Sequence, residues 1–485
     1  MTTPEISWLA IAPELVLALG AAVVLLVEVQ WKPAIRLLGW VVAVTLFAAL
    51  GLTGWQWVSA SDSLASGDVS ALRAFSDMIL MDGFAIFGRA ALLVVTILGV
   101  AAGWQFFRGL GRRGAEALAL VLLAAAGFSI MVASNNLIML FLGLEVGSIS
   151  FYVLAGFSRE SSKSDEAAIK YFLMGSFASA IFVYGVALAY AGTRQLTILG
   201  LGEYFDDFVV SSPAVILIGI GLMVVGLGFK VSAAPFHSWA PDVYQGAPSG
   251  VVGFMAAVAK IAGFAALARI LITAFPSFDN TFLPVIAGIA IVSMLLGSTL
   301  ALVQGDIRRM LAYSGVAHAG FIMTGVVGGS TSGVLFYLVV YAVQLVGAFA
   351  VVAVVSGPSS SGSELSSYRG LSRRSPLLSG SLTVLLLGMA GLPVTAGFVA
   401  KFGVFSDAWA NGYQWLVVIA VLTSVIALAF YVRIIVIMYM EDDDSEKIAV
   451  PNTVKWVLGA AVAATIIWGV LPASLLDLAA DAFPL

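Results

Sequence analysis

Residues 226–250 read GLGFKVSAAPFHSWAPDVYQGAPSG, an apolar run that carries Lys230 and meets Pro235 five residues later. Proline removes a backbone donor and clashes with the preceding helical turn, so this stretch predicts a broken helix. Residues 388–405, GMAGLPVTAGFVAKFGVF, show the same combination with Pro393 and Lys401. Irregular backbone at membrane depth is tolerated only where protein or a wet cavity surrounds it. Both stretches therefore favour a membrane protein with two interrupted helices.

The composition of the whole chain supports a location in the membrane. Hydrophobic residues make up 61% of the 485 residues and charged residues only 10%, whereas soluble domains average about 25% charged residues. Apolar runs of about 20 residues, enough to cross the hydrocarbon core as a helix, recur along the chain. We expect an all-α polytopic membrane protein, with 1–485 as a single membrane domain. About 14 transmembrane helices are expected, centred near residues 20, 46, 92, 124, 146, 180, 222, 260, 291, 317, 344, 387, 424 and 464.

The spacing of titratable residues suggests an internal repeat. Glu145 precedes Lys230 by 85 residues, and His318 precedes Lys401 by 83. Paired broken helices at corresponding positions are typical of inverted repeats, although two prolines in a helical bundle can also coincide by chance. The predicted division is 1–110 for helices 1–3, 111–275 for repeat one (helices 4–8), 280–440 for repeat two (helices 9–13) and 450–485 for helix 14.

Basic residues in the expected loops predict the orientation. Lysine and arginine concentrate in loops after odd-numbered helices, and the other loops hold only Arg73, Arg194 and Arg269. Cytoplasmic loops carry the excess of lysine and arginine. We therefore expect a multi-pass protein of the cell (inner) membrane with both termini on the non-cytoplasmic side.

Five titratable side chains lie deep inside apolar segments. They are Glu145, Lys230, Lys260, His318 and Lys401. A charge at the centre of a membrane helix costs about 2.5–3.5 kcal/mol on insertion scales. A sequence carries that cost where a partner offsets it or where the charge acts, so the set predicts a proton relay.

Structural alternatives exist for these residues. Glu145 and Lys230 could form a static ion pair, because burial disfavours an isolated charge. Lys260 could snorkel towards an interface, although its apolar flanks are long. The unperturbed pKa of a histidine, about 6.5, suits proton transfer. His318 could equally join two helices by a hydrogen bond.

Four further polar residues are weaker candidates for auxiliary roles. Lys170 begins a span and could anchor it at the interface. His237 follows the first break and could line an inlet or cap the loop. Ser314 and Gln344 could hold bridging waters or satisfy polar groups between membrane helices.

Several kinds of site are not expected in this chain. With no cysteine and two histidines, it predicts no disulfide, no Fe–S cluster held by cysteine and no conventional haem or zinc site. GLGFK lacks the spacing of a glycine-rich phosphate loop. The net charge of −4 suggests no nucleic-acid partner. We expect no cofactor and no metal in the chain itself.

The stretch FKVSAAPFHSWAPDVYQGAPSGVVGFMAAVAKIAGF resembles the signature of the antiporter-like membrane subunits of respiratory complex I. FLGLEVGSISFYVLAGF, DEAAIKYFLMGSFASAIFVYG, DIRRMLAYSGVAHAGF and GLPVTAGFVAKF extend the resemblance over residues 10–475. Within that family the chain is most similar to the subunit N branch. One departure is Gln245, at a position where the family's motif has glutamate.

The resemblance implies a proton-translocating module without electron carriers of its own. Glu145 and Lys230 would be a coupling ion pair, Lys260 and His318 would relay the proton, and Lys401 would be the terminal site. NADH, FMN, Fe–S clusters and quinone would belong to partner subunits. Partners would be the other membrane and peripheral subunits, including further antiporter-like ones, and lipid. A multisubunit cation/proton antiporter, which shares this fold, and a structural scaffold subunit are the alternatives.

Overall fold

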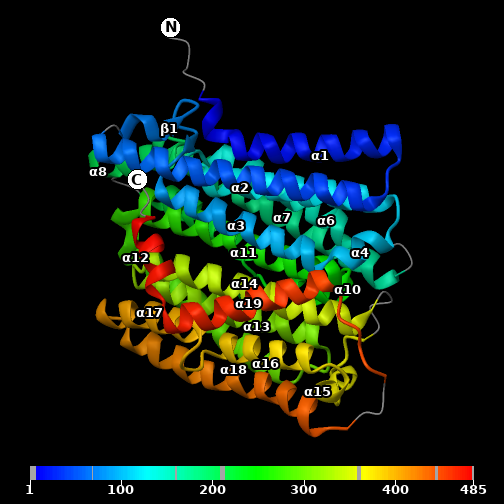
Figure 1. The fold of residues 1–485 in the computed structure, drawn as a ribbon. Coiled ribbons are helices and arrows are strands. Elements are labelled where there is room, and N and C mark those ends of the chain that lie inside the picture. Colours follow the sequence, from blue (N-terminus) through cyan, green and yellow to red (C-terminus); the bar gives the residue numbers. More distant parts are fainter. Residues whose placement is uncertain are drawn as a thin grey trace.

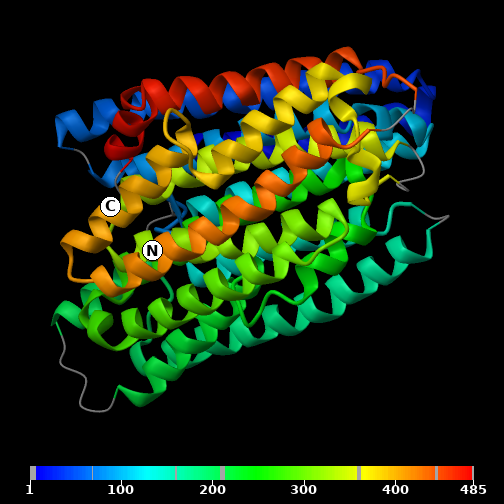
Figure 2. The same ribbon diagram turned by 90° about the horizontal axis from the view of Figure 1, so that it is seen from below.

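The computed structural model describes residues 7–67, 69–158, 161–207, 213–357, 362–442 and 446–482. The long helices run roughly parallel to one another, as the two perpendicular views in Figures 1 and 2 show. The N-terminal part contains η1 (Trp8–Ile11), α1 (Ala12–Trp31), α2 (Ile35–Ser66), η2 (Val69–Leu72), α3 (Gly83–Ala102) and α4 (Trp104–Gly109). Between η2 and α3, β1 (Arg73–Ala74) pairs antiparallel with β2 (Ile79–Leu80).

The region expected to form the first repeat is helical throughout most of its length. Its elements are α5 (Arg113–Ala133), α6 (Leu137–Ala155), α7 (Ser162–Thr193), α8 (Ile198–Asp207), α9 (Ala214–Lys230), α10 (Trp239–Gly246), α11 (Ser249–Arg269) and the π-helical turn η3 (Ile270–Ala274).

The remaining elements complete the bundle. They are η4 (Pro276–Phe278), α12 (Asp279–Leu302), α13 (Ile307–Val327), α14 (Thr331–Ser356), η5 (Leu365–Tyr368), α15 (Leu371–Arg374), α16 (Pro376–Ala390), α17 (Ala396–Ala410), α18 (Gln414–Met440), α19 (Asn452–Val470) and α20 (Ala473–Asp481).

The expected all-α membrane architecture is confirmed. In the described part of the chain, 12 helices are long and apolar enough to cross a membrane, and α9 and α16 are shorter apolar helices. Each expected helix centre falls inside a helix. The count of 14 and the two repeats stay predictions, because α9 has 17 residues and α16 has 15, fewer than the roughly 20 that span a bilayer.

Both predicted helix breaks are present, but the two lysines lie on different sides of them. α9 ends at Lys230, and non-helical backbone follows up to α10. α16 ends at Ala390, and Gly391 has φ +86, a left-handed conformation that glycine adopts without strain. Lys401 lies on α17, after the second break. The two lysines are therefore not in equivalent places along the backbone.

Two buried ion pairs fix the N-terminal helices: one joins α1 to α3, and the other joins the start of α3 to α11. Arg89 on α3 donates from Nε to Glu14 Oε1 on α1 at 2.8 Å. Arg269 donates two hydrogen bonds to Asp82 at 2.7 and 2.8 Å, and Asp82 also caps the start of α3. Arg269 is the last residue of α11 and is buried. The prediction that Arg269 lies in a loop between two helices was wrong.

The start of α1 and the helix α20 lie towards the same end of the bundle, on the left in Figure 1. The end of α20 is in contact with the start of α3, because a Cβ at Gly83 would lie 2.8 Å from the Asp481 carbonyl oxygen. This arrangement agrees with termini on one side of the membrane. Which side they face stays a prediction.

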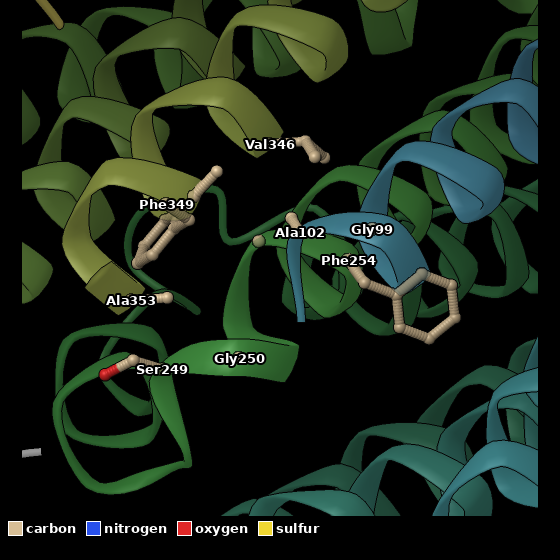
Figure 3. Close-up of a pocket in the computed structure, with 10 residues that line it drawn as sticks. Gly99, Ala102, Ser249, Gly250, Phe254, Val346, Phe349 and Ala353 are labelled. Atoms are coloured by element: carbon tan, nitrogen blue, oxygen red, sulfur yellow. The ribbon is translucent and has the colours of Figure 1, made fainter. Parts of the chain in front are cut away.

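A small apolar cavity lies where α3, α11 and α14 meet (Figure 3). Close approach of the three helices depends on glycine. A Cβ at Gly99 would lie 2.7 Å from the Phe254 Cβ, and one at Gly253 would lie 2.8 Å from the Phe349 Cβ. The N-terminal helices are thus packed directly against the two helices α11 and α14.

Candidate functional site

Lys230 is buried at the carboxyl end of α9, with 3% of its surface exposed. Its Nζ donates to Ser148 Oγ at 2.8 Å and to the Tyr171 hydroxyl at 3.4 Å. The ring of Phe128 is 4.8 Å from Nζ at its centroid. The partial negative charge at a helix carboxyl end favours a cation there. Two hydroxyls, an aromatic face and the position at the end of α9 therefore stabilise this ammonium.

Glu145 does not touch Lys230. It is half-buried on α6 and accepts a short hydrogen bond from the hydroxyl of Ser179 on α7. Among the described residues no ion pair within 4.0 Å joins it to Lys230. Ser148, one helical turn after Glu145, makes the contact with the lysine instead. The two expected partners therefore lie near one another without forming a direct pair in this structure.

Lys260 is buried on α11 and connects three segments of the bundle. Its Nζ donates to the Val231 carbonyl at 2.7 Å and to the Gly315 carbonyl at 2.9 Å. Val231 directly follows Lys230, and its carbonyl is open to Lys260 because α9 has ended. The broken helix thus supplies the acceptor that brings the second lysine next to the first.

His318 lies on α13 inside a group of tyrosines that was not predicted. Its Nδ1 is 2.9 Å from the Tyr337 hydroxyl, and its Nε2 is 3.3 Å from the Tyr431 hydroxyl. The ring of Tyr341 packs against the imidazole at 4.4 Å between centroids. Tyr337 and Tyr341 are four residues apart on α14, a spacing that places both on one helix face. That spacing is the signal in the sequence that could have revealed them.

Lys401 is buried on α17. It is the last of the five candidate residues Glu145, Lys230, Lys260, His318 and Lys401, which are called the row below. Its Nζ donates to the Ala390 carbonyl at 2.8 Å and to Ser424 Oγ at 2.7 Å. Ala390 is the last residue of α16, so the second break also supplies a free carbonyl to a lysine. The Phe321 ring centroid is 4.7 Å from Nζ.

The three buried lysines share one property. In the described part of the chain, no carboxylate lies within ion-pair distance of Lys230, Lys260 or Lys401, and each ammonium instead donates to carbonyl or hydroxyl oxygens. Such oxygens replace part of the hydration shell of a cation without neutralising its charge.

The auxiliary candidates lie in different places. Ser314 donates to the Leu311 carbonyl at 2.8 Å, a bond within its own helix. Gln344 Nε2 is 3.5 Å from the hydroxyl of Thr465 on α19, at the margin of a hydrogen bond. His237 Nδ1 is buried without a hydrogen-bond partner among the described residues, and burial lowers the pKa of this imidazole.

Lys170 belongs to a cluster of charges at the opposite end of the bundle from α20. Its Nζ contacts Glu166 at 2.7 Å and Asp242 at 2.8 Å. Arg309 on α13 reaches the same Asp242 at 2.7 Å. Partial burial acts to raise the pKa of Asp242, but the hydrogen bonds from these two cations hold it below its usual value.

No group of three or more histidine and acidic side chains that could hold a metal ion is found in the ranges that the structure describes. The row therefore consists of protonatable nitrogen atoms, hydroxyls and carbonyls.

Comparison with known proteins identifies the family to which this chain belongs. The family model described as NADH:quinone oxidoreductase/Mrp antiporter, TM, matches residues 134–427, and the chain belongs to this family. A relative from Trichlorobacter lovleyi, named NADH-quinone oxidoreductase subunit N, is 37% identical over 98% of this chain and 96% of its own length. The relative of the same name from Mycobacterium bovis is 44% identical over 77% of this chain and 72% of its own length.

Solved structures agree with this assignment. A chain of respiratory complex I from Thermus thermophilus superposes with a TM-score of 0.81 at 30% identity, covering 96% of this chain and 98% of that one. A chain of the Mrp complex from Dietzia sp. has a TM-score of 0.82 at 20% identity, covering 98% of this chain and 97% of that one. The latter likeness shows the fold alone.

Proposed function

We propose that this chain works as the N subunit of a proton-translocating NADH:quinone oxidoreductase. Protons would cross the membrane through a row formed by Glu145, Lys230, Lys260, His318 and Lys401. The observation that carries the proposal is that three lysines are buried without a carboxylate in contact among the described residues. Because a buried cation is costly unless paired, three unpaired ones favour a role in which their charge changes.

The contacts support an order for the proposed row. Lys260 donates to the carbonyl of the residue after Lys230 and to Gly315, which lies one turn before His318 on α13. A proton that leaves Lys230 thus has a lysine nitrogen nearby to receive it, and the histidine follows. Moving one proton against 100 mV costs about 2.3 kcal/mol. Two unit charges 4 Å apart attract by roughly 4 kcal/mol near a protein surface, so a movement that brings Glu145 into contact with Lys230 would change the energy of the lysine charge by a comparable amount.

The rest of the assembly would supply what the chain lacks. NADH, FMN, Fe–S clusters and quinone would lie in partner subunits, and further antiporter-like subunits and lipid would surround the exposed apolar helix faces. Lys170 and His237, with Ser314 and Gln344 in auxiliary positions, would serve the inlet and internal water sites. Pro235 and Pro393 would maintain the two helix breaks that free the carbonyls of Val231 and Ala390.

The substitution Lys230→Ala in the assembled complex tests this proposal. Quinone reduction and proton pumping are measured together in membrane vesicles, with the exposed Lys447→Ala as the matched control. We expect the Lys230 variant to pump fewer protons for each quinone reduced, and the control to match the wild type. Pumping and turnover at wild-type levels in both variants would overturn the relay.

A cation/proton antiporter of the multisubunit type is the second candidate, because the fold is shared with a chain of the Mrp complex. Purification distinguishes the two. Co-isolation with flavin and Fe–S subunits supports the oxidoreductase. Co-isolation with small membrane subunits only, together with sodium-dependent transport, supports the antiporter.

A further inference from the structure

Phe321 contacts both His318 and Lys401, the last two members of the row. The Lys401 ammonium is 4.7 Å from the centroid of the Phe321 ring. The same ring is perpendicular to the His318 imidazole, with 5.7 Å between centroids. Phe321 is fully buried. Among the described residues no hydrogen bond joins His318 to Lys401, directly or through one shared partner.

A residue at the same sequence offset in the first half of the chain is polar. Ser148 follows Glu145 by three residues, as Phe321 follows His318. Ser148 Oγ accepts a hydrogen bond from Lys230 at 2.8 Å, whereas Lys401 meets an aromatic face. Each lysine also contacts both a serine hydroxyl and an aromatic ring, Ser148 and Phe128 for Lys230 and Ser424 and Phe321 for Lys401. The difference lies in the residue three positions after Glu145 or His318: Ser148 can pass a proton to its lysine, and Phe321 cannot.

Packing around Phe321 leaves little space for water to bypass the ring. Phe405 on α17 contacts it edge-to-face at 5.9 Å between centroids. Close by on α13, a Cβ at Gly325 would lie 2.7 Å from Val404 Cγ1 on α17, so the two helices are in close contact. Packing as close as this leaves no room for a bridging water, which needs space and polar partners.

We propose that the Phe321 ring is a barrier that separates Lys401 from the rest of the row. This inference rests on the relay proposed above. The ring face attracts the ammonium of Lys401 and excludes water between it and His318. In each cycle a neutral Lys401 amine accepts one proton from the His318 side while the ring is displaced, and the ammonium releases that proton on the far side after the ring has returned. Phe321 exchanges no proton and acts as a positioning residue.

The test compares Phe321→Ser with Phe321→Leu in the whole complex reconstituted into vesicles. A serine leaves a space lined by polar groups, which water can fill, whereas a leucine keeps the site apolar. The passive proton leak is measured under an imposed pH gradient without NADH, and pumping per quinone reduced is measured with NADH. Phe402→Ser is the control, because Phe402 adjoins Lys401 in sequence but is exposed.

The proposal predicts a several-fold higher leak and a lower pumping ratio for Phe321→Ser, with the leak near wild type for Phe321→Leu and Phe402→Ser. A leak unchanged by serine, or raised equally by leucine, overturns it. If the serine variant does not assemble, Phe321→Ala is read by the same criteria, and an assembled alanine variant that does not leak also overturns it. Failure of the relay itself is recognised separately, by wild-type pumping in Lys230→Ala.

Discussion

Arg309 on α13 donates to Asp242 on α10, with 2.7 Å between Nη1 and Oδ1. Asp242 also accepts a hydrogen bond from Lys170 on α7 at 2.8 Å. α10 follows the first helix break, and α13 carries His318. One carboxylate therefore holds the segment after Lys230 against the helix that carries a later member of the row.

The Asp242–Arg309 pair is expected to contribute modestly to stability. Both side chains are partly exposed, at 34% and 27%, and pairs of this kind contribute about 0.2–1 kcal/mol. A double-mutant cycle with Asp242→Ala and Arg309→Ala, read from thermal unfolding of the purified complex, should give a coupling in that range. A coupling near zero would show that the contact does not hold α10 and α13 together.

The pH dependence of this coupling follows from the pKa of Asp242. The two cations hold that pKa below its unfolded value of about 3.9. A carboxyl group with a lowered folded pKa stabilises the fold above its unfolded pKa and loses the effect as the pH falls through the folded pKa. The coupling should therefore be constant from pH 5 to about 8 and decrease below about 4. A decrease around neutral pH would contradict the assignment to Asp242.

The resemblance described above predicts glutamate at position 245, and the contacts of Gln245 explain why an amide fits there. Its Nε2 donates to Asp306 at 3.1 Å while its Oε1 accepts from Arg309 at 3.1 Å. Only a side chain with both a donor and an acceptor satisfies these two neighbours. Gln245→Glu should place a carboxylate against Asp306 and lower the stability of the complex by about 1–3 kcal/mol.

The matched control is Gln304→Glu, because Gln304 also accepts from Arg309 but has no carboxylate contact among the described residues. Thermal unfolding of the two purified variants separates the effects. Gln304→Glu should be close to the wild type. If both glutamates are tolerated equally, repulsion from Asp306 is not the reason for the amide.

Much of the fold could be predicted from sequence because hydrophobic runs and prolines act locally. The run that ends at Lys230 and the nearby Pro235 were sufficient to place the first break. The burial of Lys260 and Lys401 could be predicted for the same reason, since each lies within an apolar helix. These inferences required no knowledge of which helices are neighbours.

The partners of the row could not be predicted, because they come from helices far apart in sequence. His318 meets Tyr431, 113 residues away, and Lys230 meets Ser148, 82 residues away. The Glu145–Lys230 pair was inferred from opposite charge and from the family resemblance, and the structure instead places Ser179 on Glu145. Arg269 was assigned to a loop because it lies near the end of a hydrophobic run, although Asp82 holds it inside the bundle.

The buried Glu14–Arg89 pair should be strongly sensitive to removal of one partner. Arg89 is fully buried and also donates to the Ala10 carbonyl at 3.0 Å, and Ser129 donates to Glu14 at 2.6 Å. Arg89→Ala leaves the glutamate without its cation, which typically costs about 3–5 kcal/mol. We expect this variant to reduce the amount of assembled complex, measured by native electrophoresis of membranes.

The double variant Glu14→Leu with Arg89→Met is the informative control. Replacing a buried pair by apolar side chains of similar volume is often neutral or stabilising. Assembly should therefore recover towards the wild type, and proton pumping should persist because neither residue belongs to the row. A double variant as defective as Arg89→Ala would show that the pair has a role other than packing the first three helices.

The tyrosines around His318 decide whether that histidine carries protons or only joins helices. Tyr431→Phe removes the hydroxyl at Nε2 and keeps the buried ring, and Tyr337→Phe does the same at Nδ1. The hydroxyl bonds are worth about 0.5–1.5 kcal/mol each, so the complex should stay assembled. We expect pumping per quinone reduced to fall, more for Tyr337→Phe because its bond is shorter.

Tyr439→Phe, on an exposed part of α18, is the control. If the double variant of Tyr337 and Tyr431 is less stable but pumps as the wild type does, His318 is a link between helices, and the proton passes from Lys260 to Lys401 by another route.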